Sequence, residues 1–208
     1  MKYIAIAFII TAAVVIYAVN RAYGEEASFD YYLLALSWSP AFCETHSDSE
    51  ECTKPRGFIL HGLWPQYEDG GHPENCDRSF VPDDVIDDMM DVMPNRRLVI
   101  HEWHTHGSCS GMDPATYFKK AKSIFNSITI PDFFTNIRGG YTTNRNGIVN
   151  VFTSENLGLK ASSIQVVCQE NRLSEVRICM DKQGNSRSCG DFGGTCQARQ
   201  IEISSPTP

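Results

Sequence analysis

Eight cysteines are the feature that most limits how this chain can fold. An even number of cysteines in a chain of 208 residues indicates four disulfides, provided that the chain folds in an oxidising compartment. Spacing favours two local loops and two longer ties: Cys43–Cys52, Cys179–Cys189, Cys76–Cys109 and Cys168–Cys196. Because eight cysteines allow roughly a hundred pairings, this framework is a prediction from proximity that leaves the other pairings open.

The N-terminal segment "MKYIAIAFIITAAVVIYAVNRAYG" indicates the compartment. Lys2 supplies a positive end, and an apolar run follows from Tyr3 to Val19. Ala22 and Gly24 then give the small–x–small pattern of a cleavage site. We therefore predict a signal peptide over residues 1–24 and a secreted, periplasmic or luminal protein. An uncleaved membrane anchor is the alternative, because the run is near the lower limit for a membrane span.

Length and charge limit what the rest of the chain does. Residues 25–208 fit one domain of moderate size. Removing residues 1–24 lowers the count of Lys and Arg from 18 to 16 against 25 acidic residues, a formal net charge of −9. That sign argues against tight, sequence-independent binding of nucleic acid, which depends on releasing counterions from the phosphates. It leaves room for an enzyme with a small local phosphate site.

Hydrophobic patterning predicts strands at both ends of the chain and helices in the middle. Short apolar or alternating runs predict strands over 31–38, 57–65, 162–170 and 173–181, the second running into a turn at Gly62 and Pro65. Apolar stripes of helical period predict helices over 81–94 and 113–128, and Pro131 and Gly139 bound a short third helix. This order indicates the α+β class, with a central antiparallel sheet flanked by helices.

The stretch "HEWHTHGSC", residues 101–109, suits either a zinc site or metal-free acid–base chemistry. A zinc-binding helix of the His-Glu-x-x-His type needs its second histidine at position 105, where this chain has Thr105. His104 and His106 lie three and five positions after His101, so His106 is about 140° round a helix from it. This spacing argues against a metal ligand set, and we expect no metal and no cofactor.

The acid–base interpretation rests on one pair and one distant partner. Glu102 and His106 are four apart and share a face if residues 101–107 are helical, so the glutamate would orient the ring and raise its pKa. The alternative is a surface pair of no consequence. Upstream, "HGLWPQ" places His61 at the mouth of a strand, where a glycine turn would expose it. Two histidines held across a pocket can act as base and acid in one displacement. Alternatively, His61 bonds a backbone carbonyl, and Trp64 is ordinary core.

Together the two segments resemble the active-site signatures of the ribonuclease T2 family. The family's first motif, His-Gly-Leu-Trp-Pro, is intact at 61–65. Its second motif, His-Glu-Trp-x-Lys-His-Gly-x-Cys, is matched at 101–109 except for the lysine. "LALSWSPAFC" is similar to the family's first strand, and "EVRICMD" to its late cysteine-bearing strand. The resemblance covers most of the chain from Tyr31 to about Cys196.

The resemblance implies a secreted or luminal endoribonuclease with an α+β fold. It would cleave RNA by transphosphorylation to 2′,3′-cyclic phosphate ends without a metal, and DNA would be inert because it lacks the 2′-OH. His106 would be the base, His61 the acid, and Glu102 would stabilise charge on the phosphorane. His101 would hold a phosphate oxygen, and Trp64 would stack on a base. We expect a monomer.

Thr105 is the departure from the family pattern. It stands where the family has lysine, and threonine offers a hydrogen bond but no charge. His104, protonated at low pH, is a candidate for the missing charge. The alternative to an active enzyme is a catalytically weak relative that binds RNA or a protein partner.

Overall fold

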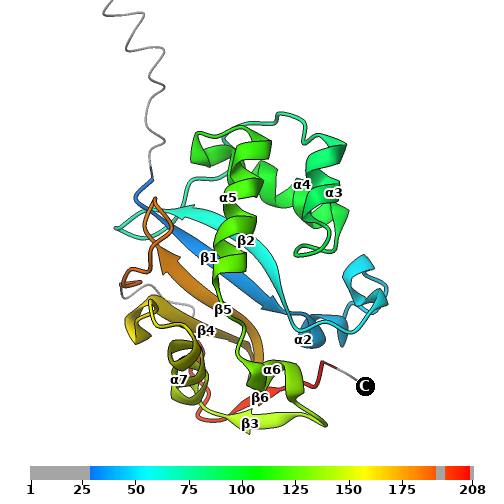
Figure 1. Ribbon diagram of the computed structural model, residues 1–208, viewed down its shortest axis with the longest axis vertical. Helices are drawn as coiled ribbons and strands as arrows, with labels where there is room; N and C mark the ends of the chain where they lie inside the picture. The colour runs from blue at the N-terminus through cyan, green and yellow to red at the C-terminus, as the bar shows by residue number, and fades with distance from the viewer. Residues whose placement is uncertain (1–28, 191–194, 207–208) are drawn as a thin grey trace, which may run out of the picture.

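A six-stranded sheet forms the centre of the computed structural model, which describes residues 29–190 and 195–206 (Figure 1). The strands are β1 (Tyr31–Trp38), β2 (Phe58–Gln66), β3 (Tyr141–Thr143), β4 (Ile164–Gln169), β5 (Arg172–Met180) and β6 (Ile201–Ile203). All pairings are antiparallel except one parallel contact between β5 and β6. The predicted α+β class with a central antiparallel sheet is confirmed.

The continuous apolar run of β1 reflects burial on both faces of the sheet. Leu34 and Leu36 point into the main core, whereas Tyr31 and Leu33 join a smaller cluster with Cys179 on the opposite face. This division follows from the two-residue period of a strand. The sheet therefore has one face covered by helices and a second face available for the site.

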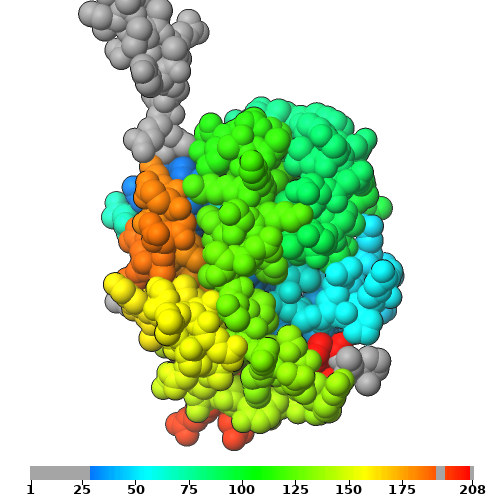
Figure 2. All heavy atoms as spheres, viewed as in Figure 1, coloured from blue at the N-terminus to red at the C-terminus, as the bar shows by residue number. Residues whose placement is uncertain are grey.

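Helices pack over the first face of the sheet and at the ends of its strands (Figure 1). They are α2 (Ser39–Cys43), α3 (Asp83–Met89), α4 (Arg96–Thr105), α5 (Pro114–Ser127), α6 (Asp132–Asn136) and α7 (Arg145–Glu155). Helix α5 lies against β1 and β2, and α7 lies beside β4 (Figure 1). The side chains of α5, α7 and the 80–110 region cover the sheet in the space-filling view (Figure 2). Tyr117, Phe118 and Ala121 of α5 are buried in the core, as the helical stripe predicts.

Several predicted boundaries are wrong. Strand β2 does not turn at Gly62 and Pro65 but continues to Gln66. The helix predicted over 81–94 spans only Asp83–Met89; the Met90 amide donates a hydrogen bond to the Asp87 carbonyl, and the chain turns there. The short third helix likewise stops at Asn136, before Gly139.

Helix α7 is absent from the sequence-based prediction. Its residues "RNGIVNVFTSE" contain a glycine, asparagines and β-branched residues, which are poor helix formers. Asn144 caps its first turn by accepting a hydrogen bond from the Gly147 amide, and Ile148 and Phe152 are buried. Tertiary burial therefore outweighs the weak local propensity.

The four predicted disulfides are confirmed: Cys43–Cys52, Cys76–Cys109, Cys168–Cys196 and Cys179–Cys189. The predicted signal peptide, residues 1–24, lies outside the described residues and stays a prediction. Among residues 29–190 and 195–206, no helix combines the length and the apolar character needed to cross a membrane.

Candidate active site

A β-bulge presents His61 on the open face of the sheet. Ala35 of β1 pairs with Gly62, and the next residue, Leu36, pairs with Leu60. His61 is therefore the extra residue of the bulge, with no partner in the ladder. Bulges redirect side chains in this way, so a bulge, and not the glycine turn expected from the sequence, exposes His61.

The His61 ring lies between two carboxylates. Its Nδ1 is 2.6 Å from Glu175 Oε1 and 3.2 Å from Ser37 Oγ, and its Nε2 is 3.5 Å from Glu102 Oε1. Burial lowers the pKa of His61, but the hydrogen bond to Glu175 and the charges of Glu102 and Glu175 outweigh burial and raise it above the ordinary value. His61 therefore holds a proton in the acidic range and can donate it.

Glu102 of α4 is buried beside β2, with 1% of its surface exposed. Its Oε2 accepts a hydrogen bond of 2.6 Å from Trp64 Nε1. Burial raises the pKa of Glu102 to about 7, although the His61 charge and the bond from Trp64 act in the opposite direction. A Cβ at Gly62 would lie 2.1 Å from Glu102 Oε2, so this position has room only for glycine.

His106 lies on the other side of Trp64, with ring centroids 5.1 Å apart. Its Nδ1 is buried without a hydrogen-bond partner among the described residues. Burial, followed by the charges of His72, His101 and His61, lowers the pKa of His106 to about 3. His106 is therefore neutral over most of the pH range and can accept a proton.

The expected effect of Glu102 on His106 is wrong. Helix α4 ends at Thr105, and His106 leaves helical geometry with φ −121° and ψ −52°. The two side chains therefore do not share a helix face, and Glu102 pairs with His61 instead. The pKa of His106 is lowered, not raised.

The remaining predicted residues lie around this group. His101 is exposed, and its charge acts on His106. His104 is half-buried, and its charge acts on Asp77, whose pKa is lowered first by a hydrogen bond with Ser79. Thr105 is half-buried, and its carbonyl accepts a hydrogen bond from the amide of Asn75.

Three further residues belong to the site and were missed in the sequence. Glu175 and Arg177 lie on β5, and His72 lies in the 67–80 loop with its ring centroid 5.4 Å from that of His106. The period of two in "LSEVRICMD" is a signal for the first two, because Glu175 and Arg177 alternate with the buried Val176 and Ile178. No local pattern signals His72.

The 67–80 loop is tied to the site by a disulfide. Cys76 bonds Cys109, which lies in the 3₁₀ turn η2 (Gly107–Ser110) directly after His106. The Cys76 amide also donates to Ser108 Oγ. Gly107 beside them is close-packed, since a Cβ there would lie 2.6 Å from the Tyr117 ring. The segment after α4 is therefore fixed by the Cys76–Cys109 disulfide and by the packing of Gly107 against Tyr117.

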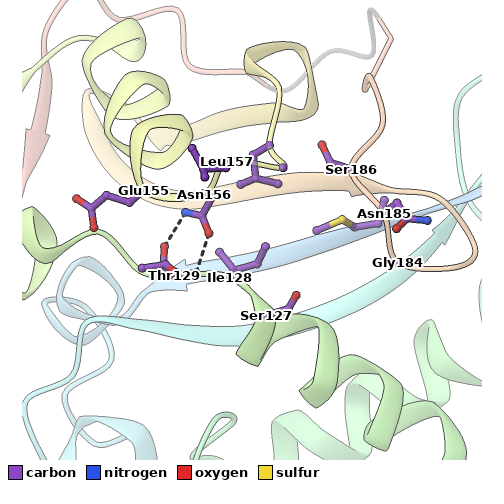
Figure 3. A pocket seen from close by; sticks show the side chains of 12 residues that line it. Ser127, Ile128, Thr129, Glu155, Asn156, Leu157, Gly184, Asn185 and Ser186 are labelled. Carbon is purple, nitrogen blue, oxygen red and sulfur yellow. Dashed lines mark hydrogen bonds between the residues drawn. The ribbon is translucent and has the colours of Figure 1, made fainter.

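A pocket of about 380 Å³ opens beside His61. His61, Glu175 and Arg177 line one wall, and the stacked rings of Phe42 and His46 line another. A separate pocket of about 550 Å³ lies between the ends of α5 and α7 (Figure 3). Its Asn156 amide is bonded to Thr129, and no histidine lines it. His61, Glu175 and Arg177 therefore line the smaller pocket, and Glu102 lies beside His61.

The donor geometry does not favour a metal site. Within the described ranges, one group of three side chains brings metal-ligand atoms together: Cys43, Glu51 and Cys52. Both cysteines are in a disulfide and cannot act as thiolate ligands. The histidines at 101, 104 and 106 form no such group.

Comparison with known proteins places this geometry in a family. The model of the Ribonuclease T2 family matches residues 29–189. A ribonuclease from Aeromonas hydrophila is 40% identical over 105 residues, covering 50% of this chain and 48% of that protein. A probable ribonuclease from Haemophilus influenzae is 29% identical over 182 residues, covering 79% of this chain and 62% of the relative. The chain thus spans about half to three-fifths of the length of these two relatives.

A solved structure agrees. The crystal structure of RNase NT in complex with 5′-AMP superposes with a TM-score of 0.64 at 25% identity, covering 85% of this chain and 98% of the other. The family match over most of the described residues, with the same fold and the two histidine segments on one site, leads to one conclusion: the chain belongs to the ribonuclease T2 family.

Proposed function

We propose that this protein is an endoribonuclease that cleaves RNA by transphosphorylation, leaving 2′,3′-cyclic phosphate ends. The observation that carries the proposal is that His61 and His106, from separate segments, both lie against Trp64, each with its ring centroid 5.1 Å from that of the indole. The pKa of His106 is lowered to about 3, whereas the pKa of His61 is raised. From about pH 3 up to the ordinary histidine pKa, His106 is a neutral base and His61 a protonated acid, which is the pair of states that a single displacement needs.

The steps follow from these protonation states. His106 takes the proton from the ribose 2′-OH, and the freed oxygen attacks the adjacent phosphorus. His61 then gives its Nε2 proton to the departing 5′-oxygen, so the P–O5′ bond breaks and the cyclic phosphate remains. RNA supplies its own nucleophile, so this first step needs no metal-bound water, and DNA is not a substrate.

Glu102 stabilises the phosphorane as a hydrogen-bond donor. With its pKa raised to about 7, the carboxyl is largely protonated in the acidic range. A protonated carboxyl can donate to a phosphoryl oxygen, whereas an ionised one would repel it. Oε2 already accepts from Trp64, so Oε1, which faces His61, is the oxygen free to carry the proton.

Because the protein carries a net negative charge, RNA binding depends on contacts of a few residues at the site. Trp64 is half-buried and offers a face on which a base can stack, an interaction that contributes about 1–3 kcal/mol. His101, exposed beside His106, contacts a phosphate oxygen. The four disulfides support folding outside the cytosol, in a secreted, periplasmic or luminal location.

The test is incubation of the purified protein with RNA in the presence of a chelator. We expect oligonucleotides with 2′,3′-cyclic phosphate ends, and His61→Ala should lower the rate by about 10²–10⁴-fold. RNA methylated at the 2′-oxygen is the matched control substrate and should stay intact. Loss of cleavage on chelation would point instead to metal chemistry.

A catalytically weak relative that binds RNA or a protein partner is the second candidate. Thr105 favours it, because the family lysine that would stabilise the phosphorane is missing at this position. Absence of cleavage between pH 4 and 8, together with retained binding of RNA fragments, would support this alternative.

A further inference from the structure

Glu175 of β5 is a buried carboxylate that the mechanism above does not use. It is 8% exposed, and both of its oxygens are bonded. Oε1 is 2.6 Å from His61 Nδ1 and 3.4 Å from Ser37 Oγ, while Oε2 accepts from Arg177 Nε at 2.7 Å and Nη2 at 2.6 Å. A buried charge with this many partners is held in one position.

We propose that Glu175, kept ionised by Arg177, is a positioning residue that holds His61 with Nδ1 protonated and Nε2 directed at the reacting phosphate. This inference rests on the function proposed above. It adds a carboxylate–histidine pair to the acid side of the reaction, where the sequence motifs contain only the histidine.

The hydrogen bond to Glu175 determines which ring nitrogen of His61 donates the proton to the leaving oxygen. An ionised carboxylate can only accept, so the His61 Nδ1 beside it must carry a hydrogen. The ring can therefore give away only its Nε2 proton, which lies on the side of Glu102. Once that proton has left, the neutral ring is already in the tautomer that Glu175 binds, so no rearrangement has to follow the transfer.

Arg177 makes an ionised carboxylate possible at this depth. Burial alone would raise the pKa of Glu175, but the bond with His61 and the charges of His61 and Arg177 lower it. The same guanidinium lies 5.1 Å from the Trp64 ring centroid. Arg177 therefore contacts both Glu175, which orients His61, and Trp64. Trp64 in turn donates a hydrogen bond to Glu102.

The charges around His61 come from several elements. Glu175 and Arg177 are on β5, Glu102 is on α4, and Glu51 lies in the 3₁₀ turn η1 (Glu50–Thr53); His106 faces it from the end of α4. Of the carboxylates, Glu175 is the nearest and has a lowered pKa, whereas Glu102 is largely neutral in the acidic range. Removing the Glu175 charge should therefore lower the pKa of His61.

The first experiment compares the pH dependence of RNA cleavage in Glu175→Gln and wild type. We expect the basic limb of kcat/KM to move to lower pH and kcat to fall about tenfold or more, with little change in KM. Glu202→Gln is the matched control, because Glu202 is an exposed glutamate of β6 whose side chain is bonded to Asn171 and does not contact His61. Arg177→Met should move the limb in the same direction, and Arg177→Lys should restore it in part. A folded Glu175→Gln variant with an unmoved basic limb overturns the proposal.

A second measurement needs no variant that could fail to fold. Nitrogen-15 NMR of the histidine rings in the wild-type protein reports the tautomer of neutral His61 at a pH above the basic limb. We expect the Nδ1–H tautomer, and the Nε2–H tautomer would contradict the inference. If wild type does not cleave RNA, or if His61→Ala cleaves it as fast as wild type, the proposed function itself fails. If wild type cleaves RNA but the basic limb of the pH profile is unchanged in Glu175→Gln, only the role of Glu175 is refuted.

Discussion

Replacing Gly62 by alanine should disconnect the two motifs of the site. Gly62 lies beside the bulge in β2, and a Cβ added there would lie 2.1 Å from Glu102 Oε2 and 2.3 Å from Trp64 Nε1. These are the two atoms that form the 2.6 Å hydrogen bond between Trp64 and Glu102. Glu102 is fully buried, and the indole ring is rigid, so neither atom can move aside without breaking the bond.

The cost can be worked from the two effects involved. Leaving a buried polar group without its hydrogen bond costs about 1–3 kcal/mol, and overpacking a close-packed site costs about 1–3 kcal/mol. The effects overlap at one place, so we expect the free energy of unfolding to fall by about 2–4 kcal/mol. For a chain of this size, each kcal/mol lowers the melting temperature by roughly 2–4 °C, giving a fall of roughly 5–15 °C.

The assay is a thermal melt of Gly62→Ala beside wild type, followed by RNA cleavage at a temperature where both are folded. The matched control is Gly158→Ala, because nothing lies within 4 Å of a Cβ at that glycine. We expect the control to melt within about 4 °C of wild type, since an unobstructed alanine changes stability by less than about 1 kcal/mol. The reasoning is refuted if Gly62→Ala melts with the control and cleaves RNA at the wild-type rate.

Three other outcomes are expected. The rate of RNA cleavage should rise as pH passes through about 3, where His106 loses its proton, and fall as Glu102, with its pKa of about 7, and His61, with its raised pKa, lose theirs; a profile peaking above pH 8 would contradict this order. Because the folded-state pKa of Glu102 is raised to about 7, its protonated form stabilises the fold below the ordinary value, and that stability is lost as pH rises from about 4.5 to 7. Glu102→Gln should therefore flatten the melting temperature across that window, and a slope equal to that of wild type would refute the assignment. Replacing both Cys76 and Cys109 by serine opens a loop of sequence separation 33 and should lower the free energy of unfolding by about 3–4 kcal/mol in urea titrations, unless the 67–80 loop is held by other contacts.

Much of the fold could be predicted because its signals are local. The continuous apolar run at 31–38 and the alternation at 173–181 mark β1 and β5, and Asp113 and Pro114 mark the start of α5. Helix α7 could not be predicted, because its stability comes from burying Ile148 and Phe152 against the rest of the protein. The predicted disulfide pairs are correct, but spacing alone was not sufficient for them, because Cys189 is nearer in sequence to Cys196 than to its partner Cys179.

The sequence by itself identified three chemical groups of the candidate site, because His61, Glu102 and His106 stand in two short motifs whose residue types are suited to acid–base work; it did not identify Glu175, Arg177 or His72. Only the tertiary structure decided how they are paired. Because of the bulge at His61 and the end of α4 at Thr105, Glu102 pairs with His61, and His106 is half-buried with a lowered pKa. Glu175 reaches His61 across 114 positions of sequence, through the pairing of β1 with β2 and β5. These contacts depend on strand register, and the resulting pKa values depend on burial. Neither register nor burial can be derived from a local pattern of residues.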